Sequence, residues 1–232
     1  MFRMPPLTPF VRVLLIALFG AFIAAALLEN FMGVPVVRHL ALNPIAFGPL
    51  TALQVVTYPL VVPTRDLFPL LISLLFLWLI LAPFEERYGL ARTVQLAVVA
   101  TLSAALSAIL VGQLVPEMVA GSMAGPQWIT LSAVSAYAVL LPPYAEVNFF
   151  GVFPMRAKYL LALVVGFSVL GFITHPDAAA LGADLGAIGS ALAFVKWWMQ
   201  KPPPRSGGGP KRKGGPSLRL VKQGDAPKHW VH

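Results

Sequence analysis

The chain has 232 residues, of which 58% are hydrophobic and 11% charged, and its mean hydropathy is +0.78. These values exclude an ordinary soluble domain of this size and indicate a membrane protein. The lack of cysteine excludes disulfides, a thiolate nucleophile and zinc–thiolate sites. The four scattered histidines also lack the HExxH spacing of a zinc protease, so we expect no metal and no small-molecule cofactor. The net charge of +8 is carried by loops and the C-terminal segment. In a membrane protein, basic residues at such positions indicate the orientation of the spans.

Apolar stretches that can span a membrane recur along the chain from close to the N-terminus. They run over residues 10–28, 67–84, 93–114, 128–141, 158–174 and 178–199. A helix needs about 20 residues to cross a hydrocarbon core of about 30 Å, and the fourth stretch reaches that length by extending back through Met123. The first stretch is longer than the h-region of a signal peptide, so we interpret it as an uncleaved anchor. The sequence therefore predicts an all-α polytopic membrane protein with a six-transmembrane-helix domain over residues 1–199.

Two segments differ from these spans in composition. Residues 32–66 form a long connection rich in proline and hydrophobic residues; it is too apolar for a solvated linker and is expected to lie in the membrane interface. Residues 200–232 are rich in proline, glycine, lysine and arginine and cannot bury a core, so they are predicted to be a disordered basic tail. Anionic lipid is the expected partner of this tail, at about 1 kcal/mol per basic residue near the surface. Nucleic acid is not an expected partner, because aromatic residues are not interleaved with the charges.

The distribution of lysine and arginine predicts the orientation of the spans. With a cytoplasmic N-terminus, all of the 17 basic residues except Arg38 and Arg65 fall on the cytoplasmic side, as the positive-inside rule requires. We therefore expect a multi-pass protein of the cell (inner or plasma) membrane with both termini in the cytoplasm. The fourth and sixth spans then both run inward from the outer face, which places Gln127 and Asp184 at the same membrane depth.

Small residues recur every four positions along the sixth stretch, at Gly182, Gly186 and Ser190. Such a repeat allows two helix backbones to approach closely in lipid, where no hydrophobic force drives helices together. We therefore expect this stretch to pack tightly against a neighbouring helix.

Several short segments of the chain look like motifs of a known family, and they occur in that family's order. Residues 125–142 open with Gly-Pro-Gln-Trp and close with proline, residues 84–89 read Phe-Glu-Glu-Arg-Tyr-Gly, and residues 183–187 read Ala-Asp-Leu-Gly-Ala. These segments resemble the Gly-x-Ser-Gly nucleophile helix, the Glu-x-Arg-x-Gly signature and the Ala-His-Leu-Gly-Gly opening of the last span in the rhomboid family of intramembrane serine proteases. The Gln-Val-Val-Thr-Tyr-Pro strip at residues 54–59 looks like the family's approach to span two. The resemblance covers about residues 10–200 and implies a six-helix rhomboid-like bundle.

The resemblance also assigns positions to the family's catalytic dyad. The nucleophilic serine falls on Gln127, and the general-base histidine falls on Asp184. A hydroxyl nucleophile needs an adjacent base, whereas a carboxamide offers no lone pair that a base could activate. The resemblance therefore implies that no catalytic residue remains. The amide of Gln127 could instead donate a hydrogen bond to Asp184, worth about 0.5–2 kcal/mol in a membrane.

The family's oxyanion-binding positions depart from the pattern as well. The histidine and asparagine on span two correspond to Pro69 and Ser73, and Gly125 opens the nucleophile segment. Proline has no side-chain donor, and the loss of one oxyanion donor costs about 10²–10³ in rate. We expect a structural role for the signature that closes span two, with Glu85, Arg87 and Gly89 as its residues.

Two alternatives stay open. An active rhomboid endopeptidase would need a substitute dyad, for which Ser122 and His175 are the candidates on the outer side; Ser122 lies in a glycine-flanked turn and breaks the register to Pro142. A small transporter or channel component would use Asp184, because a carboxyl inside a span is costly and usually faces protein or water. An aspartyl protease mechanism is disfavoured, since it needs two carboxylates that share a proton.

The favoured function is that of a pseudoprotease. Inactive proteins that this chain resembles bind transmembrane segments and influence the trafficking or degradation of membrane clients, and the resemblance implies the same class here. A client helix would enter through a lateral gap between spans two and five, beside Gln127, Asp184 and Ser73. Transmembrane segments of membrane proteins are therefore the expected partners.

Overall fold

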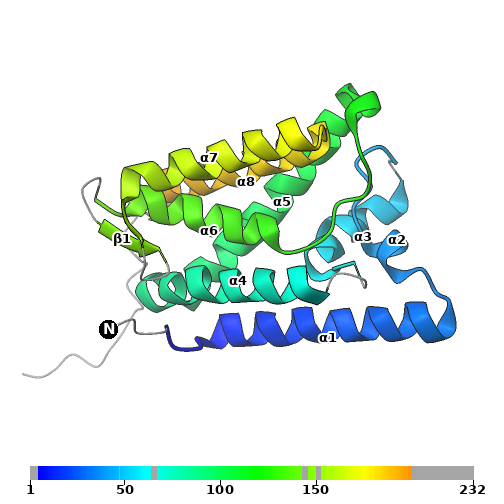
Figure 1. The fold of residues 1–232 in the computed structure, drawn as a ribbon, viewed down its shortest axis with the longest axis horizontal. Coiled ribbons are helices and arrows are strands. Elements are labelled where there is room, and N and C mark those ends of the chain that lie inside the picture. The colour runs from blue at the N-terminus through cyan, green and yellow to red at the C-terminus, as the bar shows by residue number, and fades with distance from the viewer. Residues whose placement is uncertain (1–4, 47, 64–66, 143–145, 150–152, 200–232) are drawn as a thin grey trace, which may run out of the picture. The chain divides into compact units, whose positions relative to one another are not determined.

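Six long helices form the body of the computed structural model, which describes residues 5–46, 48–63, 67–142, 146–149 and 153–199 (Figure 1). They are α1 (Pro9–Met32), α4 (Leu67–Tyr88), α5 (Leu90–Leu114), α6 (Gln127–Leu140), α7 (Ala157–Thr174) and α8 (Ala178–Phe194). Each coincides with one of the apolar stretches found in the sequence. The predicted basic tail, residues 200–232, lies outside the described residues.

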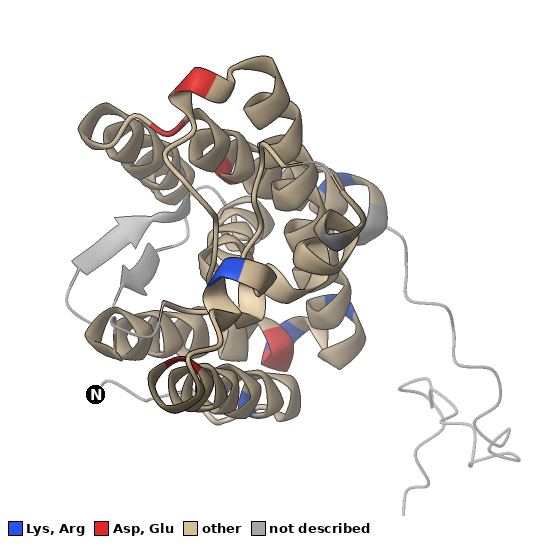
Figure 2. Cartoon of the chain, turned by 90° about the vertical axis from the view of Figure 1, so that its right-hand side faces the viewer, with Lys and Arg blue, Asp and Glu red and all other residues tan. Residues whose placement is uncertain are grey.

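The length and composition of these helices indicate a multi-pass membrane protein. Four of them are long and apolar enough to cross a membrane: α1, α4, α5, and α8 together with the π-helical turn that continues it. The other two, α6 and α7, are shorter apolar helices. Charged residues occupy few positions on the described helices (Figure 2). Large apolar side chains are exposed instead, among them Phe19, Leu75, Leu106 and Phe167, and such a surface matches lipid rather than water.

The long connection between α1 and α4 is folded rather than irregular. It contains α2 (Val36–Leu40), α3 (Pro49–Thr57) and the 3-10 helix η1 (Tyr58–Leu60). The fully buried Tyr58 donates its hydroxyl hydrogen to the carbonyl of Thr101 on α5 at 2.9 Å. Burial raises the pKa of the Tyr58 phenol above its ordinary value, so the hydroxyl keeps its proton and remains a donor. The connection is thereby fixed to the helix bundle.

A second attachment joins the connection to the segment between α5 and α6. Leu42 and Met123 pair in an isolated antiparallel bridge, with N···O distances of 2.9 and 2.8 Å.

A short antiparallel hairpin lies between α6 and α7 in the sequence. It is formed by β1 (Glu146–Phe149) and β2 (Phe153–Arg156), and the sequence did not lead us to predict it.

The close packing expected of the sixth stretch is present, and its partner is α5. A Cβ atom on Gly186 would stand 2.7 Å from the backbone oxygen of Ser103, and one on Gly182 would stand 2.8 Å from a methyl group of Val111. Real Cβ atoms do not come this close, so only glycine fits at these two positions. The α5 and α8 backbones therefore lie in direct contact.

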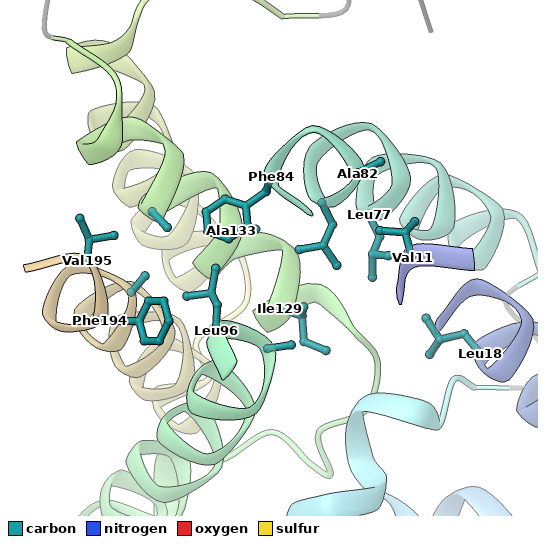
Figure 3. Close-up of a cluster of buried hydrophobic side chains, with 14 residues drawn as sticks. Val11, Leu18, Leu77, Ala82, Phe84, Leu96, Ile129, Ala133, Phe194 and Val195 are labelled. Atoms are coloured by element: carbon teal, nitrogen blue, oxygen red, sulfur yellow. The ribbon is translucent and has the colours of Figure 1, made fainter. Parts of the chain in front are cut away.

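A cluster of buried side chains joins five helices near the ends of α4 and α8 (Figure 3). Phe84 of α4, Leu96 of α5 and Phe194 of α8 meet Ala133 of α6, and Val11 extends the cluster to α1. Because α1 contributes to this core, it is part of the bundle rather than a separate anchor.

The carboxylate of Glu85 caps the start of α1 from a distant part of the chain. It is 4% exposed and accepts hydrogen bonds from the hydroxyl of Thr8, from the backbone N–H of Phe10 at 3.0 Å and from that of Val11 at 3.1 Å. The first N–H groups of a helix have no partner within it, and the hydroxyl of Thr8 does not cap them. Glu85 therefore joins α4 to α1, a structural role of the kind expected for this position.

The rest of that signature forms the turn between α4 and α5. Gly89 adopts a φ of 85°, which favours glycine, and its carbonyl accepts a hydrogen bond from the hydroxyl of Thr93 at 3.0 Å. Arg87 is exposed, with its guanidinium 5.6 Å from the ring centre of Tyr88. Both residues shape the end of α4.

Candidate functional site

The half-buried carboxyl of Asp184 connects three helices. Its Oδ1 atom accepts a hydrogen bond from the indole Nε1 of Trp128, the second residue of α6, at 3.1 Å. The buried side chain of Ser168 on α7 lies close to the same carboxyl. Asp184 itself lies on α8, so α6, α7 and α8 meet at one polar group. A carboxyl inside an apolar helix is costly unless it is bonded in this way.

Trp128 also connects this cluster to the segment before α4. Its buried ring packs against the ring of Tyr58, with the centroids 5.3 Å apart and the planes tilted by 55°. The backbone oxygen of Tyr58 accepts a hydrogen bond from the N–H of Gly125 at 2.9 Å. Tyr58, Trp128, Asp184 and Ser168 thus form a continuous series of contacts, which we call the Trp128 cluster.

The described structure contains no hydrogen bond from Gln127 to Asp184. The neighbouring Trp128 donates a hydrogen bond to this carboxyl instead. Successive residues of an α-helix point about 100° apart, so the rotation of α6 that turns Trp128 toward α8 turns Gln127 in a different direction. Gln127 is exposed, and its amide oxygen folds back over Gly125, which has a φ of 107°. The structure therefore does not bring together by a hydrogen bond the two positions that the resemblance assigns to a dyad.

The positions that the resemblance assigns to an oxyanion site are not linked to Gln127 or Asp184 by hydrogen bonds in the described structure. On α4, Pro69 is exposed and Ser73 half-buried, and neither has a hydrogen bond to Gln127 or Asp184 in the described structure. The N–H of Gly125 is occupied by the carbonyl of Tyr58. A backbone donor that is already bonded cannot stabilise a developing oxyanion without breaking that bond.

The substitute dyad is not assembled either. Ser122 is exposed in the segment before α6, and His175 is exposed just after α7. Within the described ranges no hydrogen bond joins their side chains. A nucleophile and its base need to come within about 2.6–3.2 Å of each other, although this distance is often longer in the absence of substrate.

Comparisons with known proteins do not assign a family to the chain. No protein-family model matches the sequence, and no curated protein matches it. Among the residues that the structure describes, no group of three or more histidine, cysteine, aspartate or glutamate side chains could hold a metal ion. The Trp128 cluster is therefore the polar centre on which a functional proposal can be based.

We expect a double-mutant cycle to identify Trp128 as the partner of Asp184. Trp128→Phe keeps an aromatic ring beside Tyr58 but removes the indole donor, and its coupling with Asp184→Ala should be about 1 kcal/mol. Gln127→Ala should show no coupling with Asp184→Ala, because Gln127 is exposed and does not touch the carboxyl. The free energy of unfolding is measured by SDS titration in mixed micelles. A larger coupling for Gln127 than for Trp128 would contradict this assignment.

Proposed function

We propose that the chain is a six-span, rhomboid-like membrane protein without protease activity, which binds transmembrane segments of client membrane proteins. Its termini would both lie in the cytoplasm. The observation that carries the proposal is the hydrogen bond from Trp128 to Asp184. The resemblance places the general-base histidine at position 184. This chain has a carboxyl there instead, and that carboxyl accepts a hydrogen bond that connects α8 to α6.

The groups around this bond support a non-catalytic centre. Gln127 offers a carboxamide at the nucleophile position, is exposed, and has no hydrogen bond to Asp184 in the described structure. Gly125 has already donated its N–H to Tyr58. Acyl transfer needs a nucleophile, a base and free oxyanion donors together. At the positions that the resemblance assigns, the hydroxyl nucleophile is replaced by an amide, the carboxyl in the place of the base is engaged by Trp128, and the N–H of Gly125 is engaged by Tyr58.

The arrangement of α4, α6 and α7 supports client binding. Helix α6 packs against both of the others, whereas α4 and α7 make no extended contact with each other (Figure 1). Both carry large exposed apolar residues, such as Leu71 on α4 and Leu170 on α7. A transmembrane helix packs on such a surface by van der Waals contact and by interhelical hydrogen bonds. Asp184 accepts a hydrogen bond from α6, and its second carboxyl oxygen can accept a further hydrogen bond from a client.

Site-specific photocrosslinking in membranes tests client binding. A photoreactive amino acid at Ser73 or Gln127 should capture peptides that map to transmembrane segments of other proteins. The same label at Ile16, an exposed residue of α1, is the control for non-specific lipid-side contact and should capture far less. Capture at Ser73 should fall when Asp184→Ala is added. Equal capture at all three positions would refute the client-binding proposal.

A fluorophosphonate probe tests the absence of serine protease activity. The purified wild-type chain should stay unlabelled, since Gln127 has no hydroxyl. The double variant Gln127→Ser/Asp184→His supplies the missing groups and serves as the comparison. Labelling of the wild type at Ser122, located by mass spectrometry, would support the active-protease alternative instead.

A further inference from the structure

A hollow of about 450 Å³ lies between α2 and the segment that connects η2 (Pro116–Met118) to α6. It is lined by Val37, Arg38, Asn43, Ile45, Val119, Gly121 and Ser122. None of these residues belongs to the Trp128 cluster. The hollow is thus a separate feature, and an inference about it does not depend on the proposed client binding.

The three polar side chains that line this hollow can all donate hydrogen bonds. The Oδ1 atom of Asn43 already accepts the N–H groups of Ile45 at 3.1 Å and Ala46 at 3.3 Å, which leaves the amide NH₂ of Asn43 as its free group. Arg38 contributes a guanidinium, which can only donate. Ser122 adds a hydroxyl. A group rich in acceptor oxygens would therefore be complementary to this lining.

The charged residue that lines the hollow, Arg38, is positive and therefore favours the same kind of acceptor-rich ligand. No aspartate or glutamate lines it, and Arg38 forms no salt bridge within the described ranges. The carboxylate of Glu29 comes near α2 but is bonded to the backbone N–H of Val37 at 2.9 Å. The exposed guanidinium of Arg38 therefore contributes a positive charge to the lining of the hollow.

The remaining lining is apolar. Val37, Ile45 and Val119 provide aliphatic surface beside the donors. A volume of about 450 Å³ lies within the usual range of about 300–1,000 Å³ for small-molecule sites, which combine apolar walls with a few placed polar groups. An inorganic ion alone would leave this surface uncovered.

We propose that the hollow binds an anionic oxygen group, a phosphate or carboxylate, that carries a short apolar chain. The anion would contact Arg38, the amide of Asn43 and the hydroxyl of Ser122. Its chain would cover the aliphatic wall. The source of this chemistry is either an anionic lipid headgroup or a soluble organic acid.

Calorimetric titration of the purified full chain in an uncharged maltoside detergent tests this site. Hexyl phosphate should bind saturably, hexanol should not, and inorganic phosphate should bind more weakly than hexyl phosphate. Arg38→Gln should lower the affinity for hexyl phosphate about tenfold, because charge-assisted hydrogen bonds to phosphate are lost. Arg12→Gln removes an equally exposed charge on α1 and should leave the affinity unchanged.

Asn43→Asp provides a sharper second variant. The aspartate keeps an oxygen for the N–H groups of Ile45 and Ala46, so the turn is retained, but it replaces the free donor with a negative charge. Binding of hexyl phosphate should be abolished. Unchanged binding in this variant, equal losses in Arg38→Gln and Arg12→Gln, or no saturable binding to the wild type would each overturn the proposal.

Competition experiments then distinguish the two sources of the ligand. If dihexanoylphosphatidylglycerol displaces hexyl phosphate and dihexanoylphosphatidylcholine does not, the site recognises an anionic lipid headgroup. If neither lipid competes but glycerol phosphate does, the site takes a soluble organic phosphate. Both results support an anion site that depends on Arg38.

Discussion

Gly186→Ala is expected to lower the free energy of unfolding by about 1–3 kcal/mol, the usual cost of overpacking a tight interface. The added methyl group would stand 2.7 Å from the backbone oxygen of Ser103 on α5. A backbone atom cannot rotate away as a flexible side chain can, so α5 and α8 would have to separate. SDS titration monitored by far-UV circular dichroism measures the effect.

Gly189→Ala is a matched control on the same helix. A Cβ at Gly189 would have no atom within 4 Å. Alanine has a higher helix propensity than glycine by about 1 kcal/mol in water, so this substitution should be neutral or stabilising. If Gly186→Ala and Gly189→Ala behaved alike, the contact between α5 and α8 would not contribute to stability as described.

Glu85→Ala is expected to destabilise the protein by about 3 kcal/mol. Hydrogen bonds to a charged group contribute about 1.5–3 kcal/mol each, and the change leaves buried N–H groups of α1 without a partner. Losses at one site do not add fully, which keeps the expected value below the sum of the bonds with Thr8, Phe10 and Val11. The start of α1 should also become susceptible to hydrogen exchange.

Glu86→Ala removes the same charge one residue further along α4 and is the natural control. Glu86 is exposed, and surface substitutions usually change stability by less than about 0.5 kcal/mol. Glu85→Gln keeps an acceptor oxygen but loses the negative charge, so its effect should fall between those of the other two variants. Equal stability of the Glu85→Ala and Glu86→Ala proteins would disprove the capping role.

The positions of the helices could be predicted because hydropathy alone identifies them. Each apolar stretch became a helix, although α1 extends to Met32 and α4 to Tyr88, beyond the predicted ends. The short helices between α1 and α4 were not predicted. They depend on tertiary contacts such as those of the buried Gln54, whose side chain bonds to the carbonyl of His39 and to the N–H of Asn43.

The details of the candidate site were harder to predict than the helices. The sequence interpretation matched Asp184 with the right helix, α6, but with the wrong side chain. Which of two adjacent residues faces a neighbour depends on the rotation of the helix, and this is set by packing that a single sequence does not reveal. The signal that could have identified Trp128 is chemical: a buried indole N–H usually has an acceptor, and Asp184 supplies one here. Ser168 gave no comparable signal.

The capping of α1 by Glu85 has a consequence for biogenesis. Glu85 is synthesised 77 residues after Thr8, so its cap on α1 cannot form while α1 is being made. Translation must proceed through the end of the second hydrophobic segment before that carboxylate can reach the first N–H groups of α1. The contact between the start of α1 and Glu85 of α4 therefore forms late, after both helices have been synthesised.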